Sequence, residues 1–82
     1  MMTVIDDTTL SSIHVLDRSG DLEHKWDPGD PDGVKIARDV FKSAQKKRML
    51  IYKVGRQGDR EQIREFDPEA KHIVAIPQLQ GG

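Results

Sequence analysis

The segment PQLQGG, residues 77–82, holds the first group that could do chemistry. Two successive glycines have no Cβ atoms and accept almost any backbone angles, so such a segment can thread a narrow enzyme channel with its carboxylate foremost. Pro77 separates the segment from the apolar residues before it, and Leu79 is its only apolar side chain. We therefore expect Gly81 and Gly82 to form an accessible end with a reactive carboxylate. The alternative is a frayed terminus without a chemical role.

A second candidate site is a basic stretch in the middle of the chain. Residues 35–64 hold ten bases against three acids, whereas residues 1–34 hold eight acids against two bases. Clustered bases attract phosphate groups or acidic protein surfaces. Tyr52 is the only aromatic residue between Lys42 and Arg64, so only one side chain there could stack on a nucleobase. We therefore do not expect nucleic acid as a partner. The expected protein-contact patch comprises Lys42, Lys46, Lys47, Arg48, Lys53, Arg56, Arg60 and Arg64.

The remaining polar residues do not form a recognisable catalytic or metal-binding motif. His14, His24 and His72 are far apart and lack the spacing of helical metal ligands. The acidic loop DPGDPDG would need a glutamate at its twelfth position to bind calcium, and Arg38 stands there. The chain has no cysteine, no Gly-x-Ser-x-Gly turn and no phosphate loop. We expect no metal, no cofactor and no enzymatic activity.

Hydrophobic spacing predicts the elements that must position these groups. Residues 11–26 alternate about the turn-forming DRSGD and predict a hairpin. Asp30 and Pro31 are suited to begin a helix, which we expect to run to about Lys47. Its apolar face comprises Val34, Ala37, Val40, Phe41 and Ala44. Residues 49–54 and 72–76 predict two further apolar strands, and residues 61–66 a possible edge strand.

The predicted order is β-β-α-β-β-β, an α+β plan in which one helix packs on a small mixed sheet. A β-grasp-like fold has this order, and other two-layer topologies remain open. With 82 residues, the chain suffices for one domain. We expect a flexible or docking arm at 1–10, the domain at 11–77 and a diglycine tail at 78–82. No apolar stretch approaches the roughly 20 residues of a membrane span, and no signal peptide is evident, so the expected location is cytoplasmic.

The stretch IVAIPQLQGG resembles the C-terminus of small ubiquitin-like sulfur carriers, such as the carrier subunit of molybdopterin synthase and the thiamine sulfur carrier. The resemblance implies a carrier or modifier whose terminal carboxylate, on Gly82, is adenylated by an ATP-dependent activating enzyme. It also implies that Gly81 allows close backbone approach and that Ile76 and Leu79 help to dock the tail. The resemblance covers the last ten residues and the order of the elements.

The set KWDP, IREFDPEA and IVAIP also resembles short uncharacterised proteins of bacteria and phages. This second resemblance implies a different function, that of a structural or assembly protein in a larger complex such as a virion. Its partners would be neighbouring subunits, which it would contact through terminal arms and charged faces. Both hypotheses describe a protein that binds rather than catalyses.

Overall fold

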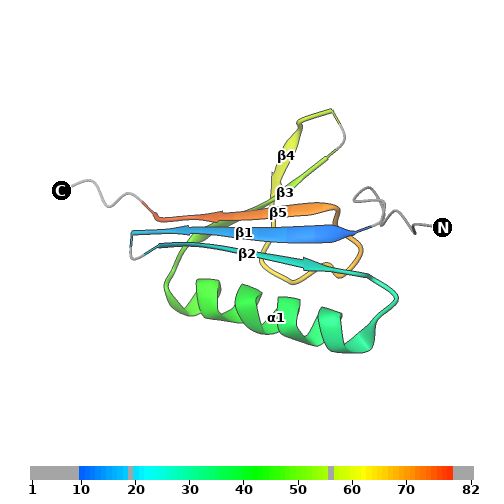
Figure 1. Cartoon of the computed structure of the whole chain (residues 1–82). Coiled ribbons are helices and arrows are strands. Elements are labelled where there is room, and N and C mark those ends of the chain that lie inside the picture. Colours follow the sequence, from blue (N-terminus) through cyan, green and yellow to red (C-terminus); the bar gives the residue numbers. More distant parts are fainter. Residues whose placement is uncertain (1–9, 19, 56, 79–82) are drawn as a thin grey trace.

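A computed structural model describes residues 10–18, 20–55 and 57–78 as one helix on a five-stranded sheet (Figure 1). The elements are β1 (Ser11–Asp17), β2 (Gly20–Trp26), α1 (Pro31–Lys46), β3 (Leu50–Val54), β4 (Arg60–Gln62) and β5 (His72–Ile76). This order confirms the predicted α+β plan of a hairpin, a helix and three further strands.

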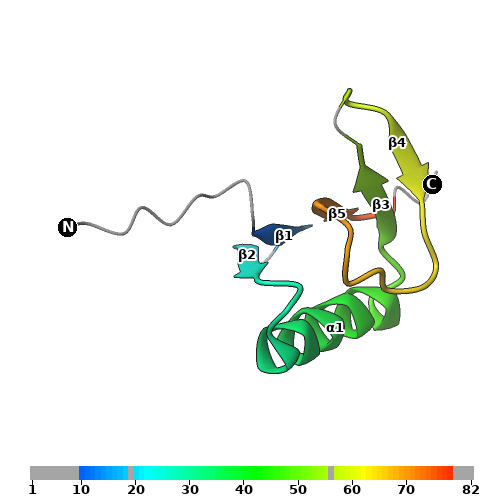
Figure 2. The same cartoon turned by 90° about the vertical axis from the view of Figure 1, so that its right-hand side faces the viewer.

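The strands lie in the order β2-β1-β5-β3-β4. β5 is therefore central, parallel to β1 and antiparallel to β3, while β1–β2 and β3–β4 are antiparallel pairs. Figure 2 shows α1 against one side of the sheet, with β3 and β4 twisted away from the β1–β2 hairpin. The mixed sheet covered by one helix agrees with the expected architecture.

The hairpin forms because apolar residues alternate along its inner face. Ile13 and Val15 are buried on β1, while His14 between them is only partly covered. In the parallel register Ile13 stands opposite Ile73 and Val15 opposite Ala75. All four residues belong to the core, so the alternation that predicts the hairpin also fixes which face meets the helix.

Helix α1 begins at a cap that the sequence specifies. Asp30 Oδ1 accepts a hydrogen bond of 3.2 Å from the backbone N–H of Asp32, and Pro31 occupies the first turn. At the other end, Arg48 adopts a left-handed φ of 58° and the N–H of Met49 donates to the Ala44 carbonyl at 3.1 Å. This tight reversal leads directly into β3 without a loop.

The core lies between α1 and the sheet. Ala37, Phe41 and Ala44 are the buried helix residues. They meet Ile13, Ile51, Ile73 and Ala75 from the strands. Trp26, 2% exposed, closes the same core from the end of β2.

The segment after β4 differs from the expected strand at 61–66. β4 is only the three residues Arg60–Gln62. The chain then bends so that Ile63 and Phe66 pack against the core. The ring centroid of Phe66 lies 5.6 Å from that of Trp26 and 5.7 Å from that of Phe41. The free energy gained by burying this aromatic ring between the helix and β2 exceeds the gain from two or three further hydrogen bonds in an edge strand.

Candidate functional site

The root of the C-terminal segment lies at one end of the central strand. Pro77 and Gln78 follow β5 and line a surface pocket of about 360 Å³ together with Asp17, Arg18, Lys47, Arg48 and Met49. Ile76 is partly buried and pairs with Leu50 of β3. Leu79, Gly81 and Gly82 lie outside the described residues. The part of the tail that is described therefore leaves the sheet beside basic side chains from two other elements.

More basic than acidic side chains line this pocket. Lys47 Nζ forms an ion pair of 2.7 Å with Asp17 Oδ2, and the lysine side chain remains 53% exposed. Arg18 and Arg48 are exposed on the same pocket. Three bases surround the tail root against one acid, so an anion that approaches Gln78 meets a net positive surface. We call Arg18, Lys47 and Arg48 the basic rim.

The other residues of the expected basic patch are divided among separate places. Lys42 and Lys46 are exposed on the second half of α1. Lys53 Nζ lies 3.4 Å from Asp67 Oδ2 in a partly buried ion pair. Arg60 is exposed on β4, and the exposed Arg64 follows that strand.

Arg64 is tied to the helix through its backbone, because its carbonyl accepts a 2.6 Å hydrogen bond from Gln45 Nε2. Arg56 lies outside the described residues. The structure thus joins Lys47 and Arg48 to the tail root rather than gathering all eight bases on one surface.

His14 and His72 lie on the same face of the sheet, opposite α1, and each contacts a different side chain. Ser12 pairs with His72 across the parallel strands, and Ser12 Oγ lies 2.9 Å from His72 Nδ1. His14, two residues along β1, lies 2.9 Å from the carboxylate of Glu23 on β2. His24 occupies the other face, where it stacks at 6.4 Å on Trp26. Within residues 10–18, 20–55 and 57–78, no group of three side chains is arranged to hold a metal ion.

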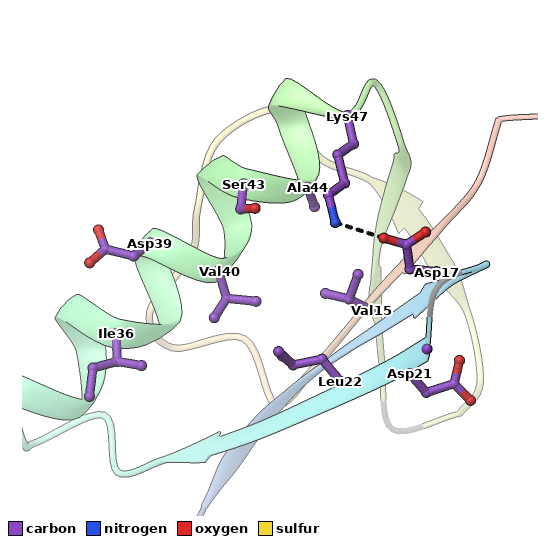
Figure 3. A pocket seen from close by; sticks show the side chains of 11 residues that line it. Val15, Asp17, Asp21, Leu22, Ile36, Asp39, Val40, Ser43, Ala44 and Lys47 are labelled. Atoms are coloured by element: carbon purple, nitrogen blue, oxygen red, sulfur yellow. Dashed lines mark hydrogen bonds and ion pairs between the residues drawn. The ribbon is translucent and has the colours of Figure 1, made fainter.

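A groove that the hydrophobic spacing did not predict lies between α1 and the hairpin (Figure 3). Its volume is about 500 Å³. Its apolar walls are Val15, Leu22, Ile36, Val40 and Ala44. Asp17, Asp39 and Lys47 provide the charged groups, and Gly20, Asp21 and Ser43 complete the lining. We call this the α1–β2 groove. A signal for it was present, because Ile36 is apolar but does not belong to the predicted buried face of the helix.

Comparison of the chain with protein-family models, with curated proteins and with solved structures found no match. In the part of the chain that the structure describes, no helix has the length and apolar character needed to cross a membrane.

Proposed function

We propose that this protein is a β-grasp-like carrier or modifier that is used through the carboxylate of Gly82 and acts by binding rather than catalysis. The sheet order supports the fold part of this proposal. A hairpin, one helix and a last strand inserted parallel to β1 at the centre of the sheet are the features of a β-grasp. The resemblance of IVAIPQLQGG to sulfur carriers supports the functional part.

The observation that carries the proposal is the position of the tail root beside the basic rim. In the proposed reaction, a carboxylate oxygen of Gly82 attacks the α-phosphorus of ATP held by an activating enzyme. The new bond is an acyl phosphate, and pyrophosphate leaves. Both the carboxylate and ATP are anionic. Guanidinium groups such as those of Arg18 and Arg48 complement carboxylates and phosphates. The basic rim also suits an acidic docking surface on that enzyme.

The test uses a candidate activating enzyme with ATP and records release of pyrophosphate and the intact mass of the product. A carrier yields an adenylate with these components, a thiocarboxylate when a sulfur donor is added, and a conjugate when an acceptor amine is added. Deletion of Gly82 removes the product because the carboxylate is then one residue short of the active centre. Gln62→Ala, an exposed change on β4, is the matched control and retains the product. If the deletion variant reacts as well as the full chain, the carrier proposal is wrong.

A second candidate function, that of an assembly protein, is favoured by the charge separation along α1. Asp27, Asp30 and Asp32 are exposed at the start of the helix, whereas Lys42, Lys46 and Arg48 are exposed toward its end. A surface with opposite charges at its two ends can bind head to tail to further copies. Contacts of this kind build rings or filaments.

Charge reversal tests the assembly function. One variant carries Lys42→Glu and Lys46→Glu, and the other carries Asp27→Lys and Asp32→Lys. Head-to-tail assembly predicts that each variant alone is monomeric by light scattering and that their mixture associates. The association should be present at about 0.01 M salt and lost at about 1 M, where charges are screened within a few ångströms. A wild-type protein that stays monomeric at low salt contradicts this function.

A further inference from the structure

We propose that the α1–β2 groove binds an extended peptide segment of a partner protein, with large apolar side chains at its centre and lysine or arginine residues beside them. This interaction surface is separate from the tail root. It does not depend on whether Gly82 is a reactive group.

The apolar walls of the groove are the first reason. Among the described residues, the exposed large hydrophobic side chains are Leu16, Leu22 and Ile36, at 40%, 49% and 51%. Leu22 and Ile36 both lie in the α1–β2 groove, where Figure 3 shows Ile36 with Val40 on the helix and Leu22 with Val15 on the facing strands. Its volume of about 500 Å³ is within the range of ligand pockets, roughly 300–1,000 Å³. Apolar side chains of a ligand would bury both residues.

The position of β2 at the edge of the described sheet is the second reason, and it favours an extended peptide. β2 is a strand of seven residues at the edge of the sheet, and its described partner is β1 on one side alone. Its outer edge adjoins the mouth of the α1–β2 groove. An added strand can hydrogen-bond to such an edge through its backbone while alternate side chains enter the neighbouring pocket.

Charge is the third reason, and it specifies the flanks of the peptide. Three aspartates line the groove, and Asp17 is held by Lys47. Asp21 stands opposite Leu16 in the hairpin register, so its side chain points to the face of the sheet away from α1. Asp39 is exposed on the helix side of the groove and forms no ion pair within the described part of the chain. A base on the ligand complements the Asp39 carboxylate. The chain's own terminal segments do not fit this description, since residues 1–9 contain two acids and no base and PQLQGG has no charged side chain.

The experiment is an NMR titration of the ¹⁵N-labelled full chain with the synthetic peptide KRVIVLRK. Two control peptides accompany it. EDVIVLDE reverses the charges, and KRVPVPRK keeps the charges but cannot add a strand because proline lacks the backbone N–H. We expect saturable shifts with KRVIVLRK for residues 20–24 and 36–43. EDVIVLDE loses the favourable charge contacts, and KRVPVPRK loses the backbone hydrogen bonds. Each control should therefore bind at least about tenfold more weakly than KRVIVLRK.

Substitutions locate the binding surface. Leu22→Ser and Ile36→Ser should each weaken binding of KRVIVLRK by about tenfold, the effect of losing the burial of one aliphatic side chain. Leu16→Ser is the matched control, because Leu16 is also exposed but lies on the opposite face of the sheet, and it should leave binding unchanged. Asp39→Lys should weaken binding of KRVIVLRK and strengthen binding of EDVIVLDE. All of these positions are exposed, so the variants should fold.

Four results would overturn the inference. The first is equal binding of KRVIVLRK and EDVIVLDE, and the second is a set of shifts confined to the face that carries Leu16. The third is self-association of the free protein that Ile36→Ser abolishes, which would make a second copy of the chain the occupant. Absence of any shift at millimolar KRVIVLRK would also reject the proposed ligand chemistry.

Discussion

The indole Nε1 of Trp26 donates a hydrogen bond of 3.1 Å to the carbonyl oxygen of Pro68, a residue 42 positions later in the chain. Trp26 lies at the end of β2, and Pro68 belongs to the irregular segment between β4 and β5. The bond therefore ties the hairpin to the segment that covers the end of the core. Phe66 from the same segment packs on the indole ring with a centroid distance of 5.6 Å.

Replacement of Trp26 by Phe should destabilise the domain by about 1–3 kcal/mol, because the Pro68 carbonyl loses its donor and the smaller ring leaves a void. Urea unfolding followed by circular dichroism measures the change. Tyr52→Phe, which alters an aromatic residue on the opposite face of the sheet, is the control and should change stability far less. An equal midpoint for Trp26→Phe and wild type would mean that the hydrogen bond contributes nothing.

Replacement of Phe41 by Ala should cost about 3–5 kcal/mol, since Phe41 is 1% exposed and contacts Phe66 at 5.7 Å. That is a large share of the stability of a small domain. Lys42→Ala, the next residue and exposed, should remain within about 0.5 kcal/mol of wild type. Thermal and urea midpoints distinguish the two, and similar midpoints would contradict the placement of the helix.

Replacement of Asp30 by Ala should remove the cap of α1 and lower stability by about 0.5–2 kcal/mol. The side chain accepts the N–H of Asp32 at 3.2 Å, a donor with no partner within the helix. Asp30→Ser, which keeps a capping oxygen, should recover most of the loss. If Ser and Ala behave alike in urea unfolding, charge near the helix dipole rather than the capping bond accounts for the effect.

Nucleic-acid binding should be weak and lost with salt. Lys47 and Lys53 are engaged with Asp17 and Asp67, and the other described bases of the expected patch are divided between the end of α1 and the region of β4. Contacts to phosphates alone weaken steeply as salt rises. Fluorescence polarisation with labelled single-stranded DNA should show no sequence preference and no binding at physiological salt. Tight, sequence-selective binding there would overturn the protein-contact interpretation of the basic residues.

The sequence predicted the elements whose signals are local. Alternation at Ile13 and Val15 indicates a strand, and Asp30 followed by Pro31 marks a helix start, because each pattern depends on neighbouring residues alone. The end of β4 was not predictable in this way. Phe66 leaves the strand to pack on Trp26 and Phe41, and neither ring is near it in sequence.

The candidate sites were still harder to predict, because they are formed by residues that lie far apart in the sequence. Ser12 and His72, 60 positions apart, meet through the parallel pairing of β1 and β5. The basic rim joins Arg18 to Lys47 and Arg48 for the same reason, because the hairpin turn, the helix end and the tail root share one end of the sheet. The α1–β2 groove depends on the angle at which the helix crosses the hairpin, which no short stretch of sequence specifies.

The parallel pairing of β1 with β5 also determines how the domain would respond to force. Because the two strands run in the same direction, Leu10 and Pro77 stand at opposite ends of the sheet (Figure 1). Tension applied between these ends acts along the strands, and it loads the hydrogen bonds between β1 and β5 together, in shear. The antiparallel β3–β4 pair, pulled from its open end, would instead release its bonds one after another. Along the axis that joins its two ends, the domain is therefore built to resist stretching.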